Sequence, residues 1–144
     1  MNRIRRWWPA LLLAGFAALA AGLASACGGD DSASDDPRVG QIGGVAELAT
    51  YAYAAAGAEG FYDYLAPEVT QRCSREGLIR AFQDMDLPTG FRGLEGVRFD
   101  GEKGRATVIL IFGREDKKVQ WAFVEAPDQG WRIAEAPGLD GCSD

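Results

Sequence analysis

The sequence predicts an α+β domain in which three N-terminal helices pack on a curved antiparallel sheet of about four strands. Apolar residues recur at helical spacing between Val45 and Met85, and beyond Pro88 the apolar period shortens to two. Short segments rich in Gly, Asp and Pro then separate the alternating stretches at regular intervals, which is typical of an antiparallel meander. Helices that precede such a sheet are expected to cover one of its faces.

The helical part opens with an alanine-rich segment at residues 45–56. Val45, Leu48 and Ala52 recur at helical spacing, and alanine has the highest helix propensity of all residues. The two glycines of GAEG, residues 57–60, are expected to end this first helix.

Shorter helical segments follow the first helix. FYDYL, residues 61–65, is expected to be a short helical piece. Pro67 is acceptable at a first helical position, because that position needs no N–H donor, and Ser74 can cap the next helix. That helix, over residues 75–85, has an apolar face formed by Leu78, Ile79, Phe82 and Met85.

The strands are predicted from alternation and from composition. RATVILIF, residues 105–112, is apolar on both faces, as expected of a central strand that is covered on each side. DGEKG, residues 100–104, is predicted to form the hairpin loop before it. The full set of expected strands is residues 94–99, 105–112, 119–123 and 131–133.

Residues 1–26 are predicted to be a lipoprotein-type signal peptide. Arg3, Arg5 and Arg6 form a basic start, and residues 7–26 are uncharged and rich in Ala and Leu. The same segment is long enough to remain as an uncleaved transmembrane helix, which is the alternative. In both cases the arginines stay cytoplasmic and the domain is exported.

Cys27 is the predicted site of lipidation. The small residues of LASA before it resemble a bacterial lipobox, in which the cysteine becomes the acylated first residue of the mature protein. The lipobox pattern favours leucine three places before the cysteine, whereas this chain has Ala24 there and Leu23 one place further back. The alternatives are a chance cysteine or one that forms a disulfide. Acyl chains such as palmitate on Cys27 would hold the protein at the outer face of the bacterial cytoplasmic membrane.

Residues 27–44 are expected to be a disordered acidic and glycine-rich tether, which places the folded domain at residues 45–144. The whole chain carries 15 Lys and Arg against 21 Asp and Glu, a net charge of −6. Cleavage of the signal peptide would remove three of the arginines. A chain this acidic is not expected to bind nucleic acid, whose recognition depends on basic side chains.

Cys73 and Cys142 are expected to form a disulfide. They are the pair that remains once Cys27 is assigned, and an even pair in an exported protein is most simply a structural bridge. A metal site is the weaker alternative because the chain contains no histidine. A redox pair would favour the CxxC spacing, which these cysteines lack. We expect neither a metal nor another cofactor.

The order of elements, together with several short motifs, resembles the NTF2-like superfamily. These motifs are the alanine-rich first helix, the GAEG break, FYDYLAPE, and the late hairpin that ends in DQGWRIAEAP. This superfamily of cone-shaped α+β domains includes nuclear transport factor 2, ketosteroid isomerase and SnoaL-like cyclases. The resemblance covers about residues 45–137 and is closest to small exported bacterial members. It implies a cone, but no particular activity, because such folds host many functions.

A set of aromatic and acidic residues is the candidate lining of a pocket inside the cone. Its members are Tyr51, Tyr62, Asp63, Phe112, Trp121, Phe123 and Trp131. The catalytic residues of the isomerase relatives have no residue-by-residue match here. The lack of histidine also weighs against acid–base chemistry, so no catalytic residue is assigned. The alternative for the aromatic residues is an ordinary core that leaves no pocket.

The leading hypothesis for function is a membrane-anchored lipoprotein whose NTF2-like domain is a non-catalytic binding or interaction module. One alternative is an isomerase- or cyclase-type enzyme that uses Asp63 or a tyrosine on a small apolar ligand in the cone. Another is an accessory subunit that forms a homodimer, or docks on a protein partner, through the face of the sheet. The enzyme requires a cavity with a buried carboxylate, and the docking subunit requires an apolar patch on the outer sheet.

Overall fold

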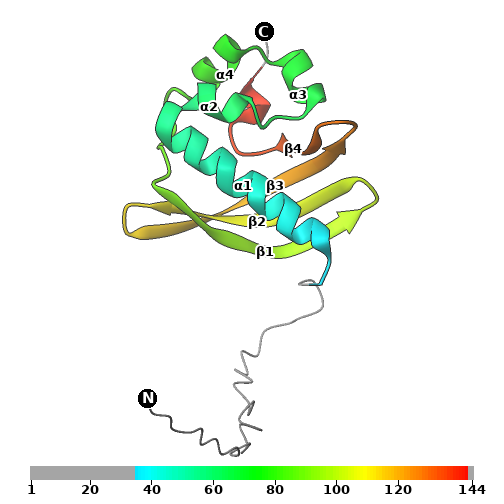
Figure 1. The fold of residues 1–144 in the computed structure, drawn as a ribbon. Coiled ribbons are helices and arrows are strands. Elements are labelled where there is room, and N and C mark those ends of the chain that lie inside the picture. The colour runs from blue at the N-terminus through cyan, green and yellow to red at the C-terminus, as the bar shows by residue number, and fades with distance from the viewer. Residues whose placement is uncertain (1–34, 143–144) are drawn as a thin grey trace, which may run out of the picture.

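The computed structural model describes residues 35–142, which form an α+β fold and so confirm the predicted class. Within these residues, four helices precede an open four-stranded antiparallel sheet with the strand order β1-β2-β3-β4 (Figure 1). The predictions for residues 1–26 and Cys27 lie outside the described residues. The elements are α1 (Pro37–Ala56), α2 (Ala58–Tyr62), α3 (Pro67–Arg72), α4 (Arg75–Phe82), β1 (Gly90–Asp100), β2 (Lys103–Phe112), β3 (Glu115–Ala126), β4 (Gly130–Glu135) and the 3₁₀ turn η1 (Leu139–Gly141).

Helix α1 begins earlier than the composition predicts. It includes residues 37–44, which were expected to belong to the tether. Pro37 occupies the first turn, and the carboxylate of Asp36 accepts a hydrogen bond from the backbone N–H of Arg38. Ile42 is fully buried, so this segment is fastened to the core and the glycines around it do not prevent a helix.

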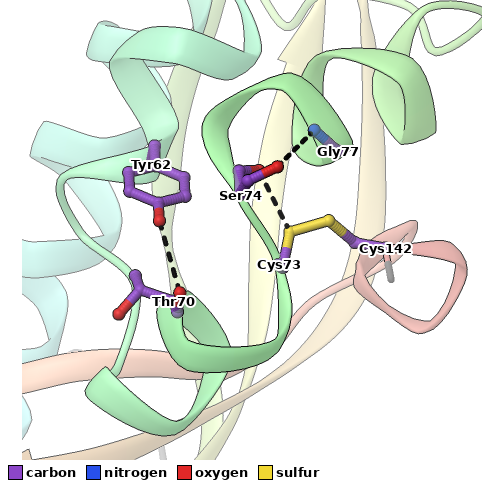
Figure 2. Close-up of a disulfide and its surroundings, with 6 residues drawn as sticks. All are labelled: Tyr62, Thr70, Cys73, Ser74, Gly77 and Cys142. Carbon is purple, nitrogen blue, oxygen red and sulfur yellow. Dashed lines mark hydrogen bonds between the residues drawn. A yellow bond between two sulfur atoms is a disulfide. The ribbon is translucent and has the colours of Figure 1, made fainter. Parts of the chain in front are cut away.

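The described residues form four helices, which corrects the expected number of three. Gly57 ends α1 with a positive φ of 63°, and α2 starts at the next residue, earlier than the piece predicted at residues 61–65. Gly60 allows the two helices to meet closely, because a Cβ at this position would collide with the backbone oxygen of Ala52. The predicted cap of α4 is confirmed, since the Ser74 hydroxyl accepts the backbone N–H of Gly77 at 3.1 Å (Figure 2).

The four strands form a simple meander in which each strand pairs with the next along the chain. β1 starts at Gly90, earlier than expected, and its pairing with β2 is interrupted between Phe91 and Gly93 and again between Glu95 and Arg98. Such bulges strengthen the local twist and bend a sheet. α1 lies across one face of this sheet, and α2, α3 and α4 gather at the top of the view (Figure 1).

The disulfide between Cys73 and Cys142 is present, with a Cα–Cα distance of 5.4 Å. Both cysteines are buried. The bridge joins the connection between α3 and α4 to the chain end that follows η1 (Figure 2). The segment that runs from β4 to Cys142 is therefore held against the helices.

Candidate functional site

A small apolar cavity of about 80 Å³ lies between the helices and the sheet. Every helix except α3, strands β2 and β3, and the segment after β4 contribute to its wall. The lining residues are Tyr53, Phe61, Phe82, Met85, Asp86, Leu110, Phe112, Val119, Trp121, Ala136 and Pro137. This cavity is the place where segments far apart in the sequence meet around an unfilled space.

Aromatic rings hold the helical side of this cavity in place. The ring of Tyr53 lies edge-on to Phe82 with 5.5 Å between ring centroids, and Phe61 lies edge-on to Trp121 at the same separation. Edge-to-face pairs of this kind contribute about 0.5–1.5 kcal/mol each beyond the area that they bury. Because these contacts connect α1, α2, α4 and β3, the wall of the cavity is a stable part of the core.

Two polar atoms on the wall have no hydrogen-bond partner within residues 35–142. They are the phenol oxygen of Tyr53 and the indole nitrogen of Trp121. Both side chains are more than nine-tenths buried, with exposed fractions of 7% and 4%. A buried donor that lacks a partner costs about 1–3 kcal/mol, so most folded proteins avoid it. These two groups on one small cavity make it the candidate binding site of the described residues.

The electrostatic environment keeps the Tyr53 phenol protonated. Burial raises the pKa of Tyr53, and the negative charge of Asp86 raises it further. Asp86 lies at the rim of the cavity with 82% of its side chain exposed, 3.8 Å from the ammonium of Lys117. That ammonium also lies 4.4 Å above the ring of Phe112. Among the lining residues the charged group, Asp86, is therefore at the rim, and the rest of the lining is apolar or aromatic.

A groove of about 400 Å³ on the helical side adjoins the cavity. The two spaces share Tyr53, Phe82 and Met85, so these side chains form the partition between them. Ile79 and Leu87 line the groove with about half of their side chains exposed. Its remaining lining residues are Ala56, Gly57, Ala58, Glu59 and Gln83. The groove and the cavity are therefore neighbouring parts of one candidate site, separated by the three side chains that they share.

The structure brings only two of the predicted lining residues, Phe112 and Trp121, to the cavity. Tyr51 is 49% exposed on the outer side of α1. Residues two apart on a helix point about 200° apart, and Tyr53 takes the inner position. Asp63 is also exposed, where it forms an ion pair with Arg75. A carboxylate in water does not have the apolar surroundings that a general base requires.

The other three predicted residues have structural contacts outside the cavity. The phenol of Tyr62 donates a hydrogen bond to the backbone oxygen of Thr70 at 3.5 Å (Figure 2). Phe123 is buried in the core. Trp131 is buried as well, and its indole N–H donates to the side-chain oxygen of Gln41 at 3.0 Å. Gln41 lies in the part of α1 that was predicted to be tether.

Tyr53 is the main residue that the sequence prediction missed. It belongs to a buried stripe on α1 that also contains Ile42, Ala46 and Ala49. This stripe follows the spacing of a single helix face. Extension of the helix to residue 37 would have placed Ile42 on the stripe, and Tyr53 would then have been predicted as an inward-facing residue.

The face of the sheet opposite α1 is mainly polar. Lys118 contacts Glu95 at 2.7 Å, and Arg105 contacts Glu135 at 3.2 Å. Gln120 donates to Thr107 on the same face. The exposed large hydrophobic residues of the described chain lie elsewhere, at Leu48, Tyr51, Ile79 and Leu87. These positions favour the helical side, rather than the sheet, as the surface that meets another molecule.

Comparison with known proteins identifies no relative. No family model, no curated protein and no solved structure matches the chain. Within residues 35–142, no group of three or more acidic, Cys or His side chains is placed to hold a metal ion. No helix in this described part is long and apolar enough to cross a membrane.

Proposed function

We propose that the chain is an exported lipoprotein, anchored through Cys27 at the outer face of the bacterial cytoplasmic membrane. Its domain is a non-catalytic binding module for a small apolar ligand, with the NTF2-like cone as its fold. The basic start, the uncharged segment and LASA before Cys27 support export and anchoring. The position of α1 across a twisted antiparallel sheet supports the cone.

The observation that carries this proposal is the cavity with two unpartnered donors, Tyr53 and Trp121. Protein sites for small molecules combine an apolar wall with a few well-placed polar groups. Binding is favoured over catalysis because every described carboxylate is at least partly exposed, and Asp86 at the rim is mostly in water.

Extraction of the purified protein tests the binding function. The full-length chain is expected to retain an apolar small molecule, detectable by mass spectrometry of an organic extract. Ala136→Leu fills the cavity and should reduce that molecule at least tenfold, while the same change at Ala134, which does not line the cavity, should leave it in place. A smaller substitution, Ala136→Val, replaces the leucine variant if that variant does not fold. Equal amounts of the molecule in the extracts of wild-type protein and of the cavity-filling variant would overturn the proposal.

A further inference from the structure

The cavity is too small to hold a whole ligand by itself. Small-molecule sites usually measure about 300–1,000 Å³, and the cavity has about 80 Å³. The adjoining groove adds about 400 Å³, and its partition includes the flexible side chain of Met85. The combined space suits an elongated molecule, of which a narrow apolar part enters the cavity and the rest lies along Ile79 and Leu87.

The two donors specify the polar group of that molecule. An indole N–H can only donate a hydrogen bond, and the protonated phenol of Tyr53 donates most readily toward an acceptor that lacks protons of its own. A water that bridged both donors would make two hydrogen bonds, fewer than the roughly three that buried waters usually make, because the wall is otherwise apolar apart from Asp86 at the rim. An oxygen with two free lone pairs, such as that of a ketone, ester or ether, can accept hydrogen bonds from two donors at once.

The charges around the site select against an anion. Asp86 lies at the rim of the cavity and Glu59 lines the groove. The ammonium of Lys117 at the rim already contacts Asp86 and the ring of Phe112. A carboxylate ligand would therefore meet two acidic side chains and no free basic one at this rim. An uncharged ligand avoids this repulsion.

We propose that the ligand is an uncharged, elongated apolar molecule with one acceptor oxygen, which accepts hydrogen bonds from Tyr53 and Trp121 inside the cavity. This inference rests on the proposed binding function. It adds the chemical class of the ligand, which the presence of a cavity alone does not define.

The test compares three six-carbon probes, 2-hexanone, n-hexane and hexanoate, which share a chain and differ in oxygen and charge. The full-length protein in lipid nanodiscs is titrated with each probe and followed by its indole N–H signals in NMR, with empty nanodiscs as the blank. 2-Hexanone is expected to bind about fivefold to tenfold more tightly than n-hexane, from one or two net hydrogen bonds. It should move the Trp121 signal downfield, and hexanoate should bind more weakly than both.

Tyr53→Phe is the decisive variant, and Tyr51→Phe is its matched control. The first should reduce the advantage of 2-hexanone over n-hexane about threefold, whereas the second should leave this ratio unchanged. Equal binding of 2-hexanone and n-hexane would overturn the inference, as would an unchanged ratio in Tyr53→Phe. A Trp121 signal that is already hydrogen-bonded without probe, and does not respond to it, would show that water satisfies the donor and would also overturn it.

This experiment and the extraction can fail separately. A retained molecule that is lost in Ala136→Leu, together with equal affinity for 2-hexanone and n-hexane, would remove only the assigned ligand chemistry. Equal extracts, together with no binding of any probe, would remove the binding function itself.

Discussion

Tyr51 and Tyr53 are two residues apart on one helix and have opposite environments. Tyr51 is exposed, whereas Tyr53 is buried with a phenol oxygen that has no partner within residues 35–142. Alternation of this kind follows from the 100° step of the helix. The tyrosine that matters for the site can therefore be identified only when the inward face of α1 is known.

Tyr53→Phe is expected to stabilise the ligand-free protein. It removes a buried hydroxyl without a partner and leaves the ring in place, so the free energy of unfolding should rise by about 1 kcal/mol. Urea denaturation of ligand-free protein measures this change, and Tyr51→Phe should remain within about 0.5 kcal/mol of wild type. A clear loss of stability in Tyr53→Phe would show that the phenol already has a partner.

The raised pKa of Tyr53 makes stability depend on alkaline pH. Because the folded-state pKa lies above the unfolded value of about 10, the contribution of this phenol is fully present below pH 10. It is lost as the pH rises through the higher folded-state value. Wild type should therefore lose stability relative to Tyr53→Phe above pH 10, measured by urea denaturation at successive pH values. If the free energy of unfolding changed with pH in the same way for wild type and Tyr53→Phe over this range, the raised pKa of Tyr53 would be contradicted.

The residues that form the candidate site could be predicted only in part from the sequence. Phe112 and Trp121 were predicted to line the pocket because aromatic residues on alternating strand positions point to one face. Asp63 was a plausible base by type, but its ion pair with Arg75 depends on how α2 and α4 meet. Tertiary contacts of that kind are not encoded in local spacing.

At the scale of elements, the first turns of α1 belong to the folded domain. Ile42 lies in the segment predicted as tether and is fully buried. Ile42→Ala should lower the free energy of unfolding by about 3 kcal/mol, through lost burial and the cavity left behind. Val39→Ala, at a half-buried position in the same segment, should cost much less. If both substitutions lowered the free energy of unfolding by the same small amount in thermal or urea denaturation, the first turns of α1 would not be packed against the core.

The disulfide fastens the element that completes the cavity. Ala136 and Pro137 form part of the wall, and a Cβ added at Gly138 would collide with Phe82 and Met85. This closely packed segment is tied to the helices through Cys142. Replacement of both cysteines by serine should lower the free energy of unfolding by about 4 kcal/mol, the chain-entropy value for a loop of this length.

The same double variant should also retain less of any bound molecule, measured in the organic extract. Wild-type protein treated with reductant is the control and should behave like the double variant in both measurements. Unchanged stability together with unchanged retention would show that the C-terminal segment is held by packing alone.

Element types were easier to predict than element limits. Alternation and the turn residues identified all four strands, because a strand and its hairpin are local features. The start of α1 was missed because the glycines at 40, 43 and 44 suggested flexibility. Burial of Ile42 and the cap at Asp36 outweigh their low helix propensity.

For the whole molecule, the α+β order was predictable and the cavity was not. The order follows from the change in apolar period near residue 88. The cavity depends on gaps between side chains such as Phe82 and Pro137, which are far apart in the sequence. No local sequence pattern predicts whether side chains fill such gaps.

Anchoring is also a property of the whole molecule. Cys27→Ala is expected to release the protein from the membrane fraction or to leave it unprocessed, because acylation and cleavage both require that cysteine. Fractionation and the apparent mass of the protein measure the two outcomes, with Ser25→Ala as a control that keeps a small residue before the cysteine. Unchanged membrane retention and processing in Cys27→Ala would favour an uncleaved transmembrane helix.

The most direct test is a crystal structure of the protein with 2-hexanone. The carbonyl oxygen should lie within about 3 Å of both the Tyr53 phenol oxygen and the Trp121 indole nitrogen, with the alkyl chain against the apolar wall. A cavity that remains empty or holds only water at saturating ketone, or a ketone bound away from both donors, would contradict the proposed site.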